Sequence, residues 1–497
     1  MGSSLSLAER HEWWGKWWTP DKPDEKFGGL AVYDPARGIT LRLTGGFDYR
    51  VFDEPAPGVK SYSGQTRDFP VVLGSVGSTL ITLLDCMVSS SSGPLFDGDR
   101  TDQTLISAML LQGCHLLSAD DAAFIAVSVS IENLPRWTQE SSITGRISIP
   151  EGGSQEQPSA TYEIGPTEDK EAHFGGNRFV LSHSYSIPHL RATKTRHEAI
   201  LHEEPSLKVE FPALVSVDKA LAPVGQLRDL VTLAIGQPCG TIKQSLLLPP
   251  DPDGYPEKHP YATHRRAIQV LAPQSYQAKP DSEPVPDHEV LFTLKDIPFA
   301  DVVPRWLEVH SRFRAAANIL LGLQYNSEQY LETRTISAVA AAESFHRALG
   351  LRPPIPNEEF AALLRALLDA TPKQHRSLVR DRLQRNEPSL KARLLDLVNR
   401  LDTQVADRLV PDRETWAKLA RDSRNNLAHE GSAESHDLNR LYAVTEVTAA
   451  VVMVNLLQEL GVPNEKIASK ITENRTLSGA ARLGRENLQG PEQGNRS

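Results

Sequence analysis

The periodicity of the apolar residues changes near residue 298, and this change predicts two parts with different architectures. Before it, short apolar runs alternate with polar residues, as at Ile39, Leu41 and Leu43, and clusters of Gly, Pro and Ser separate the runs. From Val302 onward, apolar residues recur at the spacing of helices instead. The expected fold class is therefore α+β: a β-rich, sandwich- or barrel-like N-terminal domain followed by an all-α helical bundle.

The length of 497 residues is too great for one compact core. We expect a β-rich domain over residues 1–298, interrupted by one helix from about Asp218 to Ile235, and an all-α domain over residues 299–471. A short strand is expected at Glu289 to Leu294, close to the boundary. Residues 472–497 are polar and glycine-rich, so we expect a flexible tail there.

The composition excludes several classes of protein. Hydrophobic residues make up 40 % and charged residues 23 %, which excludes disorder as the main state. The longest apolar run, Val447 to Leu457, is about half a membrane span, so no membrane association is expected. Cys86, Cys114 and Cys239 lie far apart, which excludes a disulfide scaffold or a CxxC zinc site and favours a cytoplasmic protein. No Walker loop, GxGxxG or GxSxG motif occurs, and neither a metal nor a cofactor is expected.

Charge is distributed unevenly. Residues 1–300 hold 26 basic and 38 acidic residues, whereas residues 301–497 hold 27 and 25. Within 371–400, eight basic residues stand against three acidic ones, so this stretch is the candidate basic patch. Lys373, Arg376 and Arg380 are candidate RNA-binding residues that could follow a phosphate backbone, and a solvated helix face is the alternative.

The candidate chemistry lies in a helix expected over Asp412 to Glu430. At about 100° per residue, one face collects apolar and small residues and the opposite arc collects polar ones. The expected core face comprises Trp416, Leu419, Ala420, Ser423 and Leu427, and the opposite arc comprises Arg421, Arg424, Asn425 and His429.

These polar groups suit RNA cleavage without a metal ion. The imidazole of His429 can take the proton of a 2′-OH group or donate one to the leaving oxygen near neutral pH. The guanidinium of Arg424 can stabilise the charge that develops on the phosphorus centre. The expected product is an RNA end with a 2′,3′-cyclic phosphate.

The Arg-x(4–6)-His spacing is weak evidence by itself. Five such pairs occur in the chain: Arg178/His183, Arg191/His197, Arg196/His202, Arg305/His310 and Arg424/His429. Only the last has a polar residue directly after its arginine and lies on the solvent arc of a helix in an all-helical domain. From the residues alone, a solvated helix face remains the competing interpretation.

A resemblance to a known family adds to this pattern. The segment PDRETWAKLARDSRNNLAHEG (411–431) resembles the R-x(4–6)-H helix of HEPN nucleases, in the form with Asn after the arginine. Residues 304–325 and 330–350 resemble the leading helices of the ApeA-like HEPN branch, and residues 13–47 resemble the opening of the ApeA N-terminal domain.

The resemblance implies an anti-phage protein that acts by abortive infection. Its HEPN domain would be a toxic endoribonuclease that cleaves host RNA, with tRNA as the expected target. Arg424 and His429 would be the catalytic pair and Asn425 their polar companion. Arg421, on the same polar arc of the helix, is a further candidate RNA-binding residue. HEPN nucleases usually form homodimers or higher homo-oligomers with a composite site, and the N-terminal domain would sense an unknown phage trigger or restrain the nuclease. The alternative is a non-catalytic HEPN sensor or scaffold that dimerises and binds a partner.

Two further features leave alternatives open. Trp13, Trp14, Trp17 and Trp18 could form a stacking platform for a base or a sugar, as in a carbohydrate-binding protein, or could anchor the N-terminal segment on the β core. Glu343 could orient Arg424 or His429, or could form a surface ion pair with Arg347 four residues later.

Overall fold

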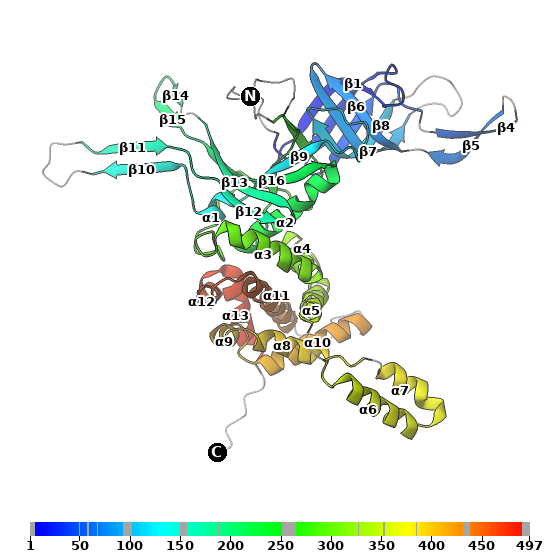
Figure 1. Cartoon of the computed structure of the whole chain (residues 1–497), viewed down its shortest axis with the longest axis vertical. Helices are drawn as coiled ribbons and strands as arrows, with labels where there is room; N and C mark the ends of the chain where they lie inside the picture. The colour runs from blue at the N-terminus through cyan, green and yellow to red at the C-terminus, as the bar shows by residue number, and fades with distance from the viewer. Residues whose placement is uncertain are drawn as a thin grey trace. The chain divides into compact units, whose positions relative to one another are not determined.

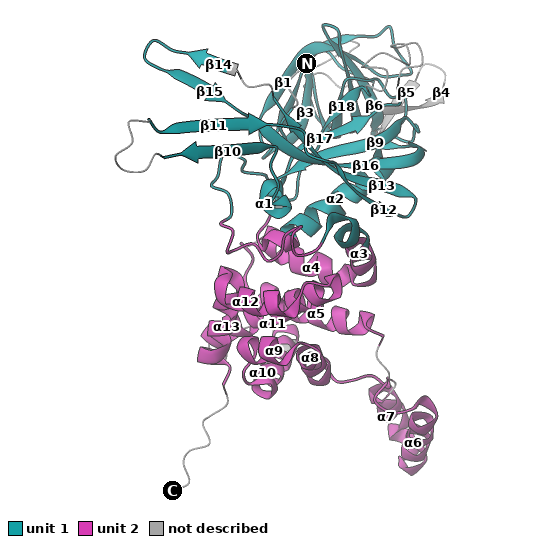
Figure 2. Cartoon of the chain, turned by 60° about the vertical axis from the view of Figure 1, so that its left-hand side comes forward, with its two compact units in different colours: residues 1–232, 239–285, 298–304 teal, residues 233–238, 286–297, 305–497 magenta. Residues whose placement is uncertain are grey.

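The computed structural model describes residues 5–48, 50–56, 59–66, 68–92, 102–149, 157–186, 189–250, 265–326, 328–350, 353–383, 385–430 and 438–489. The side chains of residues 50–65, 189 and 429–430 fall outside this description. The chain divides into two compact units (Figure 2). Unit 1 comprises residues 1–232, 239–285 and 298–304, and unit 2 comprises residues 233–238, 286–297 and 305–497, so the chain passes between the units several times.

Unit 1 contains a closed six-stranded barrel. Its strands pair antiparallel in the order β8-β3-β2-β1-β6-β7, and β7 returns to β8 to close the ring. The side chains of Trp17, Leu41, Leu83 and Leu105 fill its core and are fully buried. The strands are β1 (His11–Trp18), β2 (Phe27–Asp34), β3 (Gly38–Leu43), β6 (Phe69–Val76), β7 (Thr79–Ser91) and β8 (Gln103–Gln112).

An open sheet extends from the barrel through β8, which pairs with β18 beyond the end of its pairing with β3. Its order is β12-β13-β16-β9-β17-β18, and the helix α2 (Val217–Ile235) forms at the predicted position. The strands are β9 (Phe124–Ile131), β12 (Lys170–Phe174), β13 (Asn177–Tyr185), β16 (Glu203–Val215), β17 (Thr241–Leu247) and β18 (Ala267–Leu271), and a short helix, α1 (Leu134–Thr138), follows β9.

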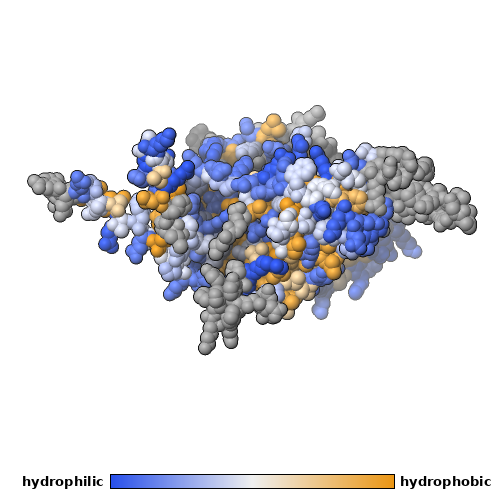
Figure 3. Space-filling model, turned by 90° about the horizontal axis from the view of Figure 1, so that it is seen from above, coloured by the Kyte–Doolittle hydropathy of each residue, from blue (hydrophilic) through white to orange (hydrophobic). Residues whose placement is uncertain are grey.

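Three two-stranded hairpins lie outside the large sheet in the described part of unit 1. Strands β10 and β11 bury no residue, and Figures 1 and 2 both draw β10–β11 and β14–β15 extending away from the sheet. Figure 3 shows one face of the molecule, on which hydrophobic residues stand in small groups among hydrophilic ones. The hairpins are β4 (Arg50–Ala56) with β5 (Val59–Thr66), β10 (Ile143–Ser148) with β11 (Ser159–Ile164), and β14 (His189–Ala192) with β15 (His197–Ile200).

The second part of the chain is helical, which confirms the α+β fold class. Helices α6 and α7 pack on each other and bury no residue, and Figures 1 and 2 draw them apart from the other helices of unit 2. The helices are α3 (Phe299–Arg312), α4 (Arg314–Tyr325), α5 (Leu331–Ala348), α6 (Asn357–Ala370), η1 (Lys373–His375), α7 (Arg376–Arg382), α8 (Leu390–Asn399), α9 (Thr403–Leu409), α10 (Arg413–Glu430), α11 (Leu438–Leu460), α12 (Asn464–Glu473) and α13 (Arg475–Asn487).

Helix α11 is the central helix of unit 2. Its length and composition would suffice to cross a membrane, but 78 % of its most apolar window is buried inside the fold. Its polar side chains bond to three neighbouring helices: Thr445 lies 2.7 Å from Thr335 of α5, Thr448 accepts from Trp416 of α10 at 3.2 Å, and Asn455 donates to the Leu397 carbonyl of α8 at 3.2 Å. These bonds are those of a core helix, in which buried polar groups find partners inside the protein.

Two sequence predictions differ from the structure. Residues 475–487 of the expected tail form α13, because Leu477, Ala480 and Ala481 bury one face and the small Gly484 packs closely beside the Leu409 carbonyl. The strand expected at Glu289 to Leu294 is a loop, in which the Leu291 N–H donates to the Ala234 carbonyl at 2.8 Å. Its apolar side chains are buried, so the strand-like composition reflected burial rather than sheet pairing.

Candidate active site

Helix α10 is held in unit 2 by one buried face. The Asp412 carboxylate caps the helix by accepting from the Thr415 N–H at 2.9 Å. Trp416 and Ala420 are fully buried, Ser423 and Leu427 are nearly so, and the face packs against α5, α8 and α11. The angular positions in the sequence therefore identified this buried face correctly, except that Leu419 is half-buried and Ala417 is also in the core.

The other arc of α10 carries accessible polar side chains. Arg421, Arg424 and Asn425 are all half-buried rather than enclosed. Arg424 donates from Nη1 to Oδ1 of Asn425 at 3.2 Å, whereas Arg421 pairs with Asp422 at 2.6 Å. Among the side chains that the structure describes, no carboxylate forms an ion pair with Arg424. The Arg424 guanidinium therefore keeps donors available for a phosphate.

His429 lies in the last turn of α10, and its side chain falls outside the described part of the chain. Because α10 is continuous from Arg413 to Glu430, the backbone positions of the candidate residues follow from helix geometry. Residues four apart lie on one face, so the Cα of His429 follows that of Asn425 by one turn. Asn425 is thus both the hydrogen-bond partner of the Arg424 guanidinium and the residue one turn before His429 on the helix.

Glu343 of α5 forms an ion pair with Arg347, 2.9 Å apart and four residues along the helix. This is the surface pair that the sequence offered as the alternative to a positioning role. No contact of Glu343 with Arg424 occurs among the described side chains. The role of Glu343 as a positioning residue stays a prediction.

The basic stretch divides into two groups. Lys391, Arg393 and Arg400 form ion pairs with Glu414, Glu387 and Glu459, so the bundle uses these three for its own structure. Lys373 of η1 and Arg380 of α7 are exposed, and Arg376 is half-buried with its Nε donating to the Thr371 carbonyl at 3.0 Å. The candidate RNA-binding positions are thus on the α6–α7 hairpin, where the fold buries no side chain.

The four N-terminal tryptophans do not share one environment. Trp13, Trp17 and Trp18 are buried: Trp13 and Trp17 belong to the barrel core, where the Trp17 indole N–H donates to the Gly29 carbonyl at 3.1 Å, and Trp18 packs edge-on against His115. Trp14 points to the other face of β1 and is 70 % exposed. The anchoring interpretation fits three of the four tryptophans, and the exposed Trp14 takes no part in the anchoring.

The three cysteines are buried in the fold, and His115, which follows Cys114, has a partner on the protein backbone. Burial raises the pKa of the Cys114 thiol to about 11 and those of Cys86 and Cys239 to about 12. His115 Nε2 lies 2.8 Å from the Gly74 carbonyl oxygen. Within the part of the chain that the structure describes, no three metal-binding side chains gather together.

Comparison with known families divides the chain at nearly the same place as its architecture. A family model described as ApeA N-terminal domain 1 matches residues 12–306. A second, described as Apea-like HEPN, matches residues 336–466, which include α10 and the α6–α7 hairpin. No curated protein and no solved structure matches the chain.

Proposed function

The chain belongs to the ApeA-like HEPN family of anti-phage effectors, and on this premise we propose that it is a metal-independent endoribonuclease that cleaves host RNA upon infection. The observation that carries the proposal is the division of α10 into a buried face and an accessible arc with Arg424, Asn425 and the backbone of His429. A helix that keeps an arginine accessible, without a carboxylate partner among the described side chains, and places a histidine five residues later suits phosphodiester chemistry.

In the proposed reaction the 2′-oxygen of a ribose attacks the adjacent phosphorus and forms the P–O2′ bond. The P–O5′ bond breaks, the 2′-OH proton passes to an imidazole, and a proton is returned to the leaving O5′. The products are a 2′,3′-cyclic phosphate and a 5′-OH end. Arg424 stabilises the additional negative charge on the non-bridging oxygens, and Asn425 holds the guanidinium through its 3.2 Å hydrogen bond.

We infer that the active form is a homodimer. One α10 offers a single imidazole, whereas two imidazoles allow one group to accept the 2′-OH proton while the other donates a proton to the leaving oxygen. A second copy of α10 facing the first supplies the second imidazole and doubles the positive charge around the phosphate. Arg421 flanks the site on the same arc, and Lys373, Arg376 and Arg380 would bind the backbone of a folded RNA such as tRNA.

The test is RNA cleavage by the purified full chain. Wild type, Arg424→Ala, His429→Ala and the surface control Arg482→Ala are incubated with total tRNA, with and without EDTA, and the RNA ends are mapped. Removing Arg424 should lower the rate by about 10²- to 10³-fold, and removing His429 by about 10²- to 10⁴-fold. Arg482 pairs with Glu486 on the surface of α13, so its variant should cleave like wild type.

Growth arrest in infected cells tests the same proposal in the presence of the trigger. Wild type should stop growth on infection, and His429→Ala should not. Equal behaviour of the two would favour a non-catalytic module that dimerises and binds a partner. Cleavage that disappears with EDTA would contradict metal independence, and cleavage that persists in both variants would place the active site elsewhere.

A further inference from the structure

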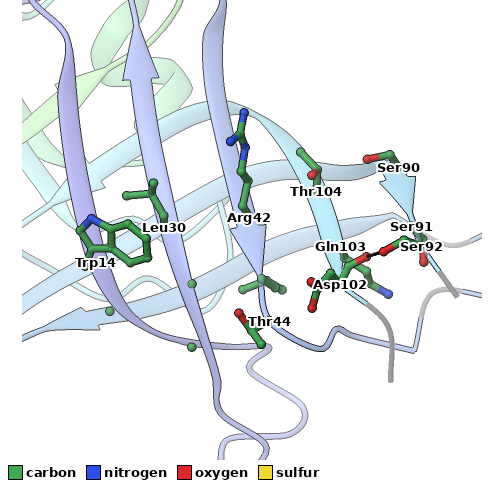
Figure 4. A pocket seen from close by; sticks show the side chains of 14 residues that line it. Trp14, Leu30, Arg42, Thr44, Ser90, Ser91, Ser92, Asp102, Gln103 and Thr104 are labelled. Atoms are coloured by element: carbon green, nitrogen blue, oxygen red, sulfur yellow. Dashed lines mark hydrogen bonds between the residues drawn. The ribbon is translucent and has the colours of Figure 1, made fainter. Parts of the chain in front are cut away.

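The exposed Trp14 belongs to a row of side chains that crosses five strands on the outside of the barrel. Trp14 pairs with Leu30, Leu30 with Arg42, Arg42 with Thr104, and Thr104 with Ser90. Figure 4 shows these side chains on one face of the strands. They line a hollow with a volume of about 740 Å³. This volume is within the usual range for small-molecule sites.

Gly28 leaves the hollow open, although the packing of the barrel does not require a glycine at this position. A Cβ added at Gly15 or Gly29 would lie 2.5 Å from a backbone oxygen, so the barrel requires glycine at both positions. A Cβ at Gly28 would have no atom within 4 Å, and no left-handed backbone conformation occurs there. Glycine weakens a strand interior and often marks the close approach of a ligand. Gly28 therefore forms a flat floor of the hollow, which suits a planar group of a ligand.

Two cations border this floor. Lys16 is opposite Gly28 on β1, and Arg42 is two strands from Trp14, roughly 10 Å away at the usual strand spacing. Both side chains are exposed, and among the described residues neither has an ion-pair partner. Elsewhere on the barrel Lys22 pairs with Asp48 at 3.0 Å and Arg10 pairs with Glu12 at 2.5 Å. Lys16 and Arg42 thus stay available for an anion.

Asp102 and Gln103 form the wall of the hollow opposite Trp14, and hydrogen bonds within the protein hold this wall in place. The Gln103 side chain donates to the Phe47 carbonyl at 2.8 Å and accepts from the Phe47 N–H at 2.9 Å. Asp102 Oδ1 accepts from the Gly45 N–H at 3.1 Å, and its backbone oxygen accepts from the Ser92 N–H at 3.1 Å and from the Ser92 hydroxyl at 3.4 Å. Because these side chains are already held in place, binding of a ligand would immobilise few protein groups, and this lowers the entropic cost of binding.

We propose that this hollow binds a nucleotide, either free or as one residue of a single strand. The base stacks on the Trp14 indole over Gly28, and the phosphate pairs with Arg42 and Lys16. A neutral sugar could also stack on Trp14, but it would leave both cations unused. The proposal concerns unit 1 alone and does not depend on RNA cleavage by α10.

The test is calorimetric titration of the full chain. The probes are the four nucleoside 5′-monophosphates, the corresponding nucleosides, and a mixed-sequence octamer of 2′-O-methyl ribonucleotides, which has no 2′-OH to attack. Trp14→Ala should weaken binding by about 5- to 150-fold, as expected for loss of one base stack. A Cβ at Gly28 meets no atom within 4 Å, and the larger side chain of Gly28→Ile should occupy the floor of the hollow and abolish binding.

Matched controls separate the site from the fold. Gly165→Ile adds a side chain at another open glycine of unit 1, and Leu117→Ala removes an apolar side chain that is 69 % exposed outside the hollow. Both should bind like wild type. Tighter binding of monophosphates or of the octamer identifies the source of the nucleotide, and either result supports the proposal. No binding of any probe at millimolar concentration, equal binding of nucleosides and nucleotides, or binding unaffected by Trp14→Ala and Gly28→Ile would overturn it.

Discussion

Replacing Glu210 by Gln is expected to destabilise unit 1 at neutral pH, because three cations converge on this carboxylate. Arg178 Nη1 lies 2.6 Å from Oε2, and Arg265 Nη1 and Lys208 Nζ lie 3.0 and 3.1 Å from Oε1. The Glu210 side chain is only 18 % exposed. Burial by itself would raise the pKa of the carboxyl group, but the three cations outweigh burial and lower the pKa to about 2.

The size of the effect follows from this pKa. The ordinary value is 4.5, so the folded state lowers the pKa by about 2.5. Each unit corresponds to about 1.4 kcal/mol, which gives about 3 kcal/mol before a small discount for solvent screening. Since the pKa is lower in the folded state, the stabilisation is complete above pH 4.5 and is lost as the pH falls towards 2.

Urea unfolding followed by tryptophan fluorescence measures this difference, because Trp13, Trp14, Trp17, Trp18 and Trp137 belong to unit 1. Glu210→Gln should be about 2–3 kcal/mol less stable than wild type at pH 7. At pH 3 the difference should shrink to about half of that value. The control Glu171→Gln removes a 42 % exposed partner of Arg178 and should have a much smaller effect. A difference for Glu210→Gln that is the same at both pH values would refute the reasoning.

Three further predictions concern packing and capping. Gly74→Ala should destabilise the barrel by about 1–3 kcal/mol, because its Cβ would lie 2.3 Å from the buried Trp17 ring; thermal unfolding should show no comparable loss for Gly28→Ala. Trp416→Phe removes the donor to Thr448 and should cost about 1–3 kcal/mol, and a double-mutant cycle with Thr448→Val should show coupling; additive effects would contradict the hydrogen bond. Asp412→Ala should lower the stability of unit 2 by about 1 kcal/mol through loss of the cap, and Asp412→Asn should retain most of it.

The arrangement around α10 could be predicted because helix periodicity is a local property. Trp416, Ala420 and Leu427 repeat at three- and four-residue intervals, and their burial follows from that spacing alone. The same local information located α2 and α10 to within one residue of their observed ends. It could not locate α13, whose buried face consists mainly of alanine and glycine and therefore has little hydrophobic signal.

Non-local pairing limited the prediction of the β-rich part. The alternation of apolar residues predicts strands, but closure of the barrel depends on the pairing of β7 with β8 and on β8 serving both the barrel and the open sheet. No single segment carries that information. The tryptophan cluster shows the difference at one strand: alternation along β1 directs Trp13 and Trp17 to the core and Trp14 outward, but the hollow around Trp14 is made by β2, β3, β7 and β8.

The candidate catalytic residues could be proposed from the sequence because they share one helix. Arg424 and Asn425 are adjacent in the chain, so their hydrogen bond needs no tertiary information. The contribution of Lys391, Arg393 and Arg400 to the bundle could not be foreseen, because their acidic partners come from other segments. A count of basic residues therefore overstated the part of the stretch that is available to RNA.

The repeated passage of the chain between its two units has a consequence for synthesis and for gene truncation. Residues 233–238 and 286–297 of unit 2 leave the ribosome before its remaining residues, 305–497. Within these early pieces Leu291 already bonds to Ala234, whereas the Glu289 carbonyl accepts from Asn474, nearly two hundred residues later. A fragment that stops at residue 298 therefore carries two orphaned segments of the helical unit, and a fragment that starts there lacks them. Separating the units by genetic means calls for rejoining several segments rather than for a single cut.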